Sequence, residues 1–315
     1  MDNKSVFVIV VTFKGWQWYD KCFTSLRAST IPVQTIMVDN ASNDGTVEYI
    51  REHYPEIHLI ESKKNLGFGK GNNLALRYAY EQGCDYVFLL NQDAWVETNT
   101  LEKLLDIHMR HLEYGILSPI HLNAEKNGIE KDIIEYLNDR KITDQSLFED
   151  LYFDRLKEVY DTKYLNAAAW LLPRETLEVI GGFDPIFSHY GEDDNYLHRV
   201  LYRKMRIGIC PLCVAVHDTK RRITALDKLV KTSSSSLLAE VTNINKHFNP
   251  VGLCLFHFRK TISKLISFQF QEARYHWKTM LFLCKNAKAI NNSRRKNVLP
   301  GMNWLSDQDI KDYAN

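Results

Sequence analysis

Tyr86-Val87-Phe88-Leu89-Leu90-Asn91-Gln92-Asp93 is an apolar run that stops abruptly on an amide and a carboxylate. Five consecutive apolar residues predict a strand that is buried on both faces, as the strands of a parallel sheet are. Open α/β sheets bind their ligands outside the carboxyl ends of the strands. The polar residues that follow this strand are therefore expected to face a ligand.

Strands and helices alternate on both sides of this run. The sequence predicts further strands at residues 6–11, 34–38, 57–60, 167–172 and 206–216. Helices are predicted at residues 16–28, 46–54 and 65–82, and another begins at Glu192. This alternation is typical of a three-layer α/β/α sandwich around a mostly parallel central sheet.

The chain divides by pattern and by charge into a body and a basic end. We expect a ligand-binding domain over residues 1–220, with a weakly patterned insertion at 121–160, and a helical region over 221–315. Residues 219–315 hold 17 Lys and Arg but only 6 Asp and Glu, a net charge of +11, whereas residues 1–218 carry −10. Such an asymmetry predicts that the basic end meets an anionic partner.

Composition excludes several classes of protein. The 315 residues are 45% apolar and 25% charged, as in soluble globular proteins. No stretch approaches the roughly 20 apolar residues that span a bilayer, and the first residues predict a strand rather than a signal peptide. The six cysteines are scattered, and the lone pair Cys210-Pro211-Leu212-Cys213 has no partner pair for zinc. A cytoplasmic location fits best, with structural thiols.

A glycine-rich segment, Asn65-Leu66-Gly67-Phe68-Gly69-Lys70-Gly71-Asn72-Asn73, opens the helix at 65–82. It departs from the dinucleotide fingerprint because Asn72 stands at the third required glycine. The segment is either a tight turn or a place where the backbone approaches a bound sugar nucleotide.

Asp39 and Asn40 end the strand at 34–38. One role for Asp39 is to close an Asx turn or cap a helix. Alternatively, its carboxylate accepts a hydrogen bond from the ring N–H of a pyrimidine base, a task that suits a group that only accepts.

Asn91, Asp93 and His217 are candidate ligands of a divalent cation. Two oxygen-bearing side chains two residues apart at a strand end can face one Mg²⁺ or Mn²⁺, which then binds a diphosphate. The neutral imidazole of His217, at the end of a later strand, could complete that shell, although strand-end histidines are also common without a ligand.

Glu192-Asp193-Asp194 begins a helix, where acidic residues also favour the helix dipole. One of these carboxylates could act as a general base toward a hydroxyl. Arg199 shares a helix face with Glu192 and is expected to pair with it. That pairing would make Asp193 the base and Glu192 its support.

Taken in order, these segments resemble glycosyltransferase family 2, the inverting enzymes with the GT-A fold. The resemblance covers about residues 5–220 and rests on Val10-Val11-Thr12-Phe13, on Val38-Asp39-Asn40, on the glycine-rich segment, on Leu89-Leu90-Asn91-Gln92-Asp93, on Gly181-Gly182-Phe183-Asp184 and on Tyr190-Gly191-Glu192-Asp193 with Arg199. Bacterial rhamnosyltransferase-like and galactofuranosyltransferase-like members, which build surface polysaccharides, look most similar.

The resemblance implies a role for each matching residue. Asp193 would be the catalytic base, and Asp93 would match the second acid of the family's Asp-x-Asp metal motif, with His217 beside the metal or diphosphate. The donor, a UDP- or dTDP-sugar, would contact the following residues: Thr12, Asp39, Asn40, Asn65, Gly67, Asn72, Asn91 and Asp93. Asn91 replaces the first acid of the metal motif, which puts the strength of Mg²⁺ or Mn²⁺ dependence in doubt.

Two other classes remain open from the sequence. A sugar nucleotidyltransferase would need a glycine-rich basic loop near the N-terminus, where only Lys14 and Gly15 stand. A non-catalytic homologue that binds sugar nucleotides or glycans would keep the fold without transfer.

The basic end interleaves aromatic and cationic residues over 251–290. It predicts either a helical region packed on the body or a peripheral contact with an anionic membrane surface through 251–296, on the inner face of the plasma membrane. No recognised nucleic-acid-binding motif accompanies the charge, so nucleic acid is not expected as a partner.

Overall fold

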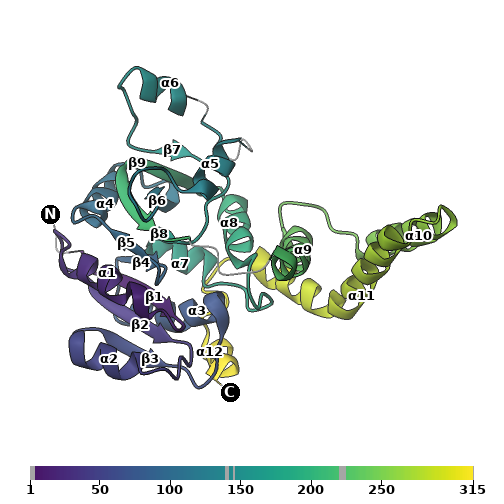
Figure 1. Ribbon diagram of the computed structural model, residues 1–315, viewed down its shortest axis with the longest axis horizontal. Coiled ribbons are helices and arrows are strands. Elements are labelled where there is room, and N and C mark those ends of the chain that lie inside the picture. The colour runs from purple at the N-terminus through teal and green to yellow at the C-terminus, as the bar shows by residue number, and fades with distance from the viewer. Residues whose placement is uncertain (1–3, 139–141, 145, 220–224, 315) are drawn as a thin grey trace.

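The computed structural model describes residues 4–138, 142–144, 146–219 and 225–314. Its centre is a nine-stranded mixed sheet in the order β3-β2-β1-β4-β8-β6-β9-β5, with β7 paired to β9. The strands are β1 (Val6–Thr12), β2 (Gln34–Asp39), β3 (His58–Glu61), β4 (Tyr86–Leu90), β5 (Ala94–Val96), β6 (Tyr114–Leu122), β7 (Tyr160–Asp161), β8 (Ala169–Pro173) and β9 (Arg206–His217). The α/β architecture expected from the sequence is confirmed (Figure 1).

Alternation along the strands builds a core on each face of the sheet. In β1, Val8 and Val10 point into one cluster with α1 (Trp16–Arg27) and α4 (Thr100–Arg110). Ile9 points into the other cluster, with α3 (Gly67–Glu81), α7 (Arg174–Ile180) and α8 (Glu192–Tyr202). Because successive side chains of a strand face opposite ways, the continuous apolar run fills both layers.

The parallel half of the sheet sets the position of the site. β1 pairs in parallel with β2 and β4, and β2 pairs in parallel with β3, so these strands end at the same edge. Beyond β4 the sheet is mixed, because β8 runs antiparallel to both β4 and β6.

Several elements were not anticipated from the sequence. The strands β5 and β6 and the helix α4 fill residues 94–122, where no element was expected. The weakly patterned insertion holds α5 (Lys131–Asn138), α6 (Leu147–Tyr152) and β7, while α2 (Thr46–His53) lies where a helix was predicted.

The basic end forms helices that leave the body and then return to it. They are α9 (Ala225–Thr242), α10 (Pro250–Ile266), α11 (Phe270–Val298) and α12 (Asp307–Ala314). Helices α10 and α11 form an antiparallel hairpin that projects from the body, which we call the arm (Figure 1). After the arm the chain packs on the body again, where Leu305 is fully buried in the same core as Ile9.

Candidate active site

The ends of β1 and β2 form the floor of the site. Thr12 is opposite Asp39 in the parallel register, and the amide of Asn40 donates to the carbonyl of Thr12 at 2.9 Å. The Asn40 side chain reaches the glycine-rich segment, where its Oδ1 accepts from the amide of Leu66 at 3.2 Å and its Nδ2 donates to the carbonyl of Gly67 at 3.2 Å. Asn40 therefore fixes the entrance of α3 against the end of β2.

The glycines of this segment are needed for close packing. Gly67 has a φ of +77°, and a Cβ there would lie 2.6 Å from the carbonyl oxygen of Ser188. A Cβ on Gly71 would lie 2.8 Å from Cγ1 of Val11. Only glycine accommodates both the left-handed backbone and these contacts.

A cavity of about 640 Å³ opens between the strand ends and this segment. Of the candidate donor-binding residues, Thr12, Asn40, Asn65 and Gly67 line it, together with Lys64, Lys70 and Gln92. Its size suits a nucleotide-sized ligand. The two lysines bring positive charge into a cavity that lies beside the start of a helix, a combination that favours anions.

Two of the expected donor-binding residues lie below this surface. Asp39 is 3% exposed, and its carboxylate accepts from the amide and the hydroxyl of Ser42, three residues further on, so it is engaged within the loop after β2. Asn72 is buried inside α3, where its Nδ2 donates to the carbonyl of Phe68 at 3.0 Å. Contact of either side chain with a donor stays a prediction.

Asn91, Asp93 and His217 come together at the end of β4. Nε2 of His217 lies 3.4 Å from Oδ1 of Asp93 and 3.4 Å from Nδ2 of Asn91. The pairing of β5 with β9, with Ala94 opposite His217, produces this proximity.

Glu130 orients the ring of His217 and was missed from the sequence. One of its carboxylate oxygens lies 3.0 Å from Nδ1 of His217, and the other lies 3.1 Å from Nδ1 of His121. Glu130 is 1% exposed. It lies in the weakly patterned insertion, and no periodicity indicates that this acid turns inward toward two histidines.

The charges in this group depend on one another. Burial alone would lower the pKa of His217, but hydrogen bonds and charge from Asp93 and Glu130 raise the pKa to about 10. Burial would likewise raise the pKa of Glu130, but hydrogen bonds with His121 and His217 lower it to about 2. Glu130 is thus ionised and holds the ring of His217 by a charge-assisted hydrogen bond.

The residues present fit a divalent cation. Within the described residues, one group of three His, Cys, Asp or Glu gathers its ligand atoms within 4.8 Å, namely His121, Glu130 and His217. The Glu130 oxygens stand at hydrogen-bond distance from both rings, as in the carboxylate–histidine pairs that orient a ligating imidazole. Nε2 of His217 faces Asp93, and the two atoms form an N and O donor set that Mn²⁺ accepts when the cation displaces the Nε2 proton.

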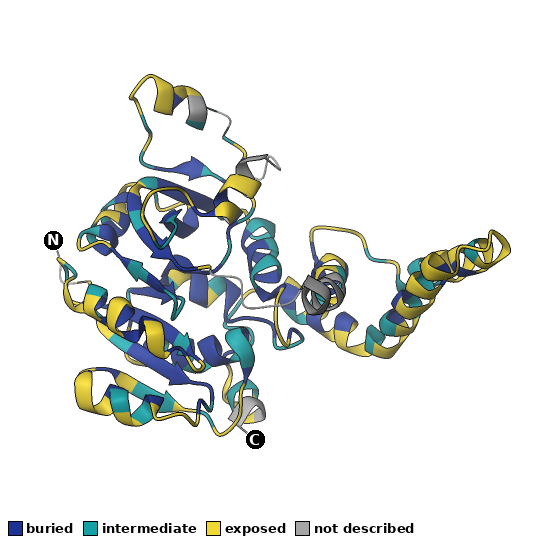
Figure 2. Ribbon diagram, in the orientation of Figure 1, coloured by how far each residue is buried: buried dark blue, intermediate teal, exposed yellow. Residues whose placement is uncertain are grey.

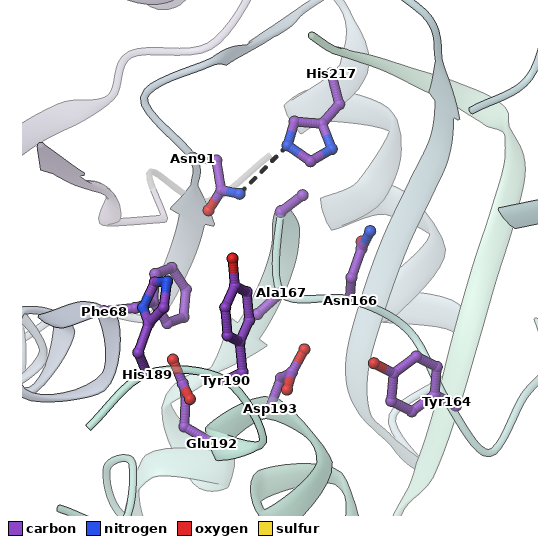
Figure 3. A pocket seen from close by; sticks show the side chains of 11 residues that line it. Phe68, Asn91, Tyr164, Asn166, Ala167, His189, Tyr190, Glu192, Asp193 and His217 are labelled. Atoms are coloured by element: carbon purple, nitrogen blue, oxygen red, sulfur yellow. Dashed lines mark hydrogen bonds between the residues drawn. The ribbon is translucent and has the colours of Figure 1, made fainter. Parts of the chain in front are cut away.

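A second cavity, of about 310 Å³, lies beside the first. It is lined by Asn91 and His217 on one side and by Glu192 and Asp193 on the other. Figure 3 shows the two carboxylates rising from the start of α8 toward Asn91 and His217. Phe68 and His189 line both cavities, so the two are adjacent.

Glu192 and Asp193 have different surroundings. Burial, and secondarily the charge of Asp193, raise the pKa of Glu192 to about 7. Its Oε2 is buried without a hydrogen-bond partner. Asp193 is partly exposed, and its Oδ1 accepts from the amide of Asp194 at 2.9 Å.

The expected pairing of Arg199 with Glu192 is wrong. The guanidinium of Arg199 instead donates to Oδ1 of Asn195 at 3.1 Å and to the carbonyls of Ile180 and Gly182 at 2.9 and 2.7 Å. Arg199 is 2% exposed and faces the turn after α7, because the carbonyls at the end of that helix need donors. It supports the helix that carries the acids without neutralising them.

Comparison with known proteins agrees with this geometry. The family model described as Glycosyl transferase family 2 matches residues 7–157. The low-salt glycan biosynthesis hexosyltransferase Agl10 of Haloferax volcanii is 23% identical over 217 residues, which cover 67% of this chain and 66% of the relative. The dTDP-rhamnosyl transferase RfbF of Shigella flexneri is 21% identical over 217 residues, covering 68% and 69%.

A third relative aligns over a shorter part. The N-acetylglucosaminyl-diphospho-decaprenol L-rhamnosyltransferase of Mycobacterium tuberculosis is 28% identical over 122 residues, which cover 36% of this chain and 40% of the relative. The aligned parts are thus about two thirds of the first two relatives and less than half of the third.

Solved structures share the fold. The mannosyltransferase PcManGT from Pyrobaculum calidifontis, in complex with GDP-Man and Mn²⁺, superposes with a TM-score of 0.58 at 17% identity, covering 98% of this chain and 85% of that one. Residues 1–349 of S. aureus TarS superpose with a TM-score of 0.56 at 15% identity, covering 98% and 89%. The matched family model over residues 7–157, the named relatives and the shared fold together make this chain similar to glycosyltransferase family 2, whose members have the GT-A fold.

Proposed function

We propose that this chain is a family 2 glycosyltransferase that moves a hexosyl group from a UDP- or dTDP-sugar to a hydroxyl of a glycan or lipid-linked acceptor, with inversion at the anomeric carbon. The observation that carries this proposal is the pair of adjacent cavities. One is sized for a nucleotide and lies at the strand ends, and the other brings Glu192 and Asp193 opposite Asn91 and His217.

The donor side is supported by charge and by the relatives. Lys64 and Lys70 line the larger cavity and would face the diphosphate. The names of the relatives specify hexosyl, dTDP-rhamnosyl and L-rhamnosyl transfer. A hexose or 6-deoxyhexose carried on a pyrimidine nucleotide therefore agrees best with the charge of the cavity and with the names of the relatives.

A divalent cation, Mg²⁺ or Mn²⁺, would be held by Asp93 and His217, with Asn91 beside them. Such a cation supplies positive charge against the leaving nucleoside diphosphate. Glu130 keeps the His217 ring in place. With an amide at position 91 in place of a second acid, we expect chelation to weaken transfer without changing the acceptor site.

Asp193 would be the general base. Its carboxylate takes the proton of the acceptor hydroxyl, whose oxygen forms a bond to the anomeric carbon. The bond from that carbon to the diphosphate oxygen breaks on the opposite face, so one displacement inverts the configuration. Positioning of the two substrates and charge at the diphosphate account for most of the acceleration.

The acceptor would approach from the other side of Asp193. A third cavity, of about 440 Å³, is lined by Asp193 and by Tyr164, Tyr190, His198 and Glu240. Hydroxyl and carboxylate groups of this kind suit the hydroxyls of a sugar. The M. tuberculosis relative is named for a lipid-linked acceptor, so we expect action at the cytoplasmic face of the plasma membrane, in surface polysaccharide synthesis.

A donor panel tests the proposed class. UDP-, dTDP- and GDP-sugars are added with Mn²⁺, and the melting temperature is measured for each. The correct donor should raise it most, because a ligand that binds the folded state stabilises it in proportion to RT ln(1 + [L]/Kd). NMR of the product should then show the inverted anomer. Retention of configuration, or donor binding with no transfer to any hydroxyl acceptor, would contradict the proposal.

Asp193→Asn tests the base. We expect the turnover number to fall by about 10² to 10⁴-fold, as when a general base is lost, while donor affinity stays within about twofold. Asp154→Asn is the matched control, because Asp154 is exposed and is not among the residues that line the three cavities. Wild-type turnover in Asp193→Asn would remove this assignment.

A further inference from the structure

We propose that the arm, residues 250–298, is a peripheral membrane anchor that binds an anionic lipid surface through one apolar face and its tip. The proposal rests on the arm's own side chains and does not depend on glycosyl transfer. Among the helices in the described part of the chain, none is long and apolar enough to cross a membrane. The contact would therefore be interfacial.

The two helices of the arm face each other through small and polar residues. His257 and Thr261 are buried on α10, and Nδ1 of His257 lies 2.9 Å from Nδ1 of His276 on α11. The sulfur atoms of Cys254 and Cys284 lie 3.7 Å apart. The interface between α10 and α11 therefore buries few of the large apolar side chains of the arm.

Five of the large apolar side chains of the arm share one side of the hairpin. In two antiparallel right-handed helices, the residues that follow each inward-facing residue point to the same side of the pair. On α10 these residues are Leu255, Phe258 and Ile262, and on α11 they are Trp277 and Leu281. Each is between 44% and 50% exposed, which is high for a large apolar side chain.

The tip of the arm is more exposed still. Ile266 is 74% exposed, Phe268 80% and Phe270 63%, and the arm is coloured as exposed along most of its length (Figure 2). A contiguous apolar surface of this kind marks a contact with a partner or a membrane. We call this tip, together with the side that carries Leu255, Phe258, Ile262, Trp277 and Leu281, the apolar face of the arm.

The charge of the arm favours a membrane over a second copy of the chain as the partner of its apolar face. The arm contains ten Lys and Arg and a single acid, Glu272. Glu272 is already paired with Lys264 at 2.6 Å. Two arms packed face to face would bring like charges together, whereas anionic lipid head groups attract such a segment. Arg274 follows the buried Ala273 and would reach the head groups from the same face.

The position of the arm relative to the active site agrees with this role. The arm leaves the body next to α9, whose Ser235, Ala239 and Glu240 line the third cavity beside Asp193. A lipid-bound arm would hold the mouth of that cavity close to the membrane surface, where a lipid-linked acceptor presents its sugar.

Co-sedimentation of the full chain with vesicles tests the proposal. Vesicles of phosphatidylcholine alone are compared with vesicles that also contain phosphatidylglycerol, at low and high salt, without any donor. We expect binding to the anionic vesicles at low salt and a loss of at least about tenfold at high salt. Absence of binding at low salt would overturn the proposal.

Variants of the arm separate its apolar face from simple charge. Ile266→Ser, Phe268→Asn and Phe270→Ser are combined, with Asn at 268 because that residue has a positive φ of 56°. Binding should weaken by at least about tenfold, with the melting temperature unchanged because these side chains contact little. Unchanged binding would rule out the apolar face.

Two controls complete the experiment. Tyr152→Ser, on the body, removes an aromatic side chain that is 83% exposed and should leave vesicle binding unchanged. Equal weakening by Tyr152→Ser and by the triple variant would contradict a specific face. Sedimentation velocity checks the alternative occupant: a dimer that dissociates in a Phe258→Ser, Trp277→Ser variant and that does not bind vesicles would show that the apolar face belongs to a second copy.

Discussion

At the scale of single residues, two adjacent acids have been given different chemistry by their surroundings. Glu192 is buried with one oxygen lacking a partner, whereas Asp193 is partly exposed between two cavities. A buried carboxyl keeps its proton to higher pH because the charged form loses hydration. These surroundings agree with the proposed role of Asp193 as the base, and they give Glu192 a pKa of about 7.

Glu192→Gln should change the pH dependence of stability. The pKa of Glu192 is about 7 in the folded chain against an ordinary 4.5, so folded protein binds more protons than unfolded protein between these values. The stability that comes from keeping Glu192 protonated is fully present below about pH 4.5 and is lost as the pH rises through 7. Urea unfolding should find the variant about 3 kcal/mol more stable than wild type at pH 8 and similar at pH 4.

The matched control for this experiment is Glu48→Gln, an exposed acid in the first turn of α2. It should shift stability by less than about 0.5 kcal/mol at either pH. If Glu192→Gln and wild type kept the same difference in stability at both pH values, the buried carboxyl would not titrate as described.

Glu130→Gln tests the orientation of His217. The amide keeps the size of the side chain but removes the negative charge that both histidines share. Titration calorimetry with Mn²⁺ should show affinity reduced by about 10 to 100-fold, as for other residues that orient a metal ligand. Glu125→Gln, an exposed change in the same segment, serves as control. Equal Mn²⁺ affinity in both variants would mean that Glu130 does not act through His217.

At the scale of elements, the glycine-rich segment joins the start of α3 to the turn before α8. The carbonyl oxygen of Ser188 lies 2.6 Å from the position of a Cβ on Gly67, so the backbone of the glycine-rich segment packs closely against the segment before α8. Since Phe68 lines both cavities, a shift of this segment changes both.

Gly67→Ala should therefore weaken donor binding. Both backbone strain and the clash with Ser188 oppose the new Cβ, and we expect the melting temperature to fall and the Kd for the nucleotide to rise about tenfold or more. Gly83→Ala is a matched control, because Gly83 has a similar φ of +79° with nothing within 4 Å of its Cβ. Gly83→Ala introduces the backbone strain without the clash, so it should leave the Kd for the nucleotide unchanged. Equal Kd values in the two variants would contradict the role of this contact.

At the scale of the whole molecule, the last part of the basic end is attached to the body. The carbonyl of Asn303 accepts from the amide of Gly182 at 2.8 Å, and the carbonyl of Leu305 accepts from Arg77 at 2.8 Å. Asp184 accepts from Ser293 and from Asn297 at 2.5 and 2.8 Å. The turn that precedes the catalytic helix is thus held by the end of the arm.

Leu305→Ala should destabilise the catalytic body although it lies beyond the arm. The side chain is fully buried against the core beside Ile9, so its truncation should cost about 2–5 kcal/mol. Leu299→Ala, at a residue that is 60% exposed, should cost less than about 0.5 kcal/mol. Thermal unfolding followed by near-UV circular dichroism compares them, and equal melting temperatures would show that the end of the chain is not part of the core.

The sequence by itself determined the parallel half of the sheet and the places where polar residues end its strands. Apolar runs such as Tyr86–Leu90 can be buried only between two layers, and a strand that stops on Asn91 and Asp93 places them at a common edge. Asn40, Asn91 and His217, which line the two adjacent cavities, were predicted on this basis, whereas Asp193 was predicted from its place at the start of a helix and from the family resemblance.

Only the tertiary structure decided what these side chains contact. Glu130 reaches His217 across 87 positions of the chain, Arg199 bonds to Asn195 and to backbone carbonyls rather than to Glu192, and Leu305 returns to a core formed by β1. The physical reason is that periodicity records which face of an element is buried but not what lies opposite it. A charged or polar group chooses its partner by the three-dimensional placement of unsatisfied donors and acceptors, which no local pattern encodes.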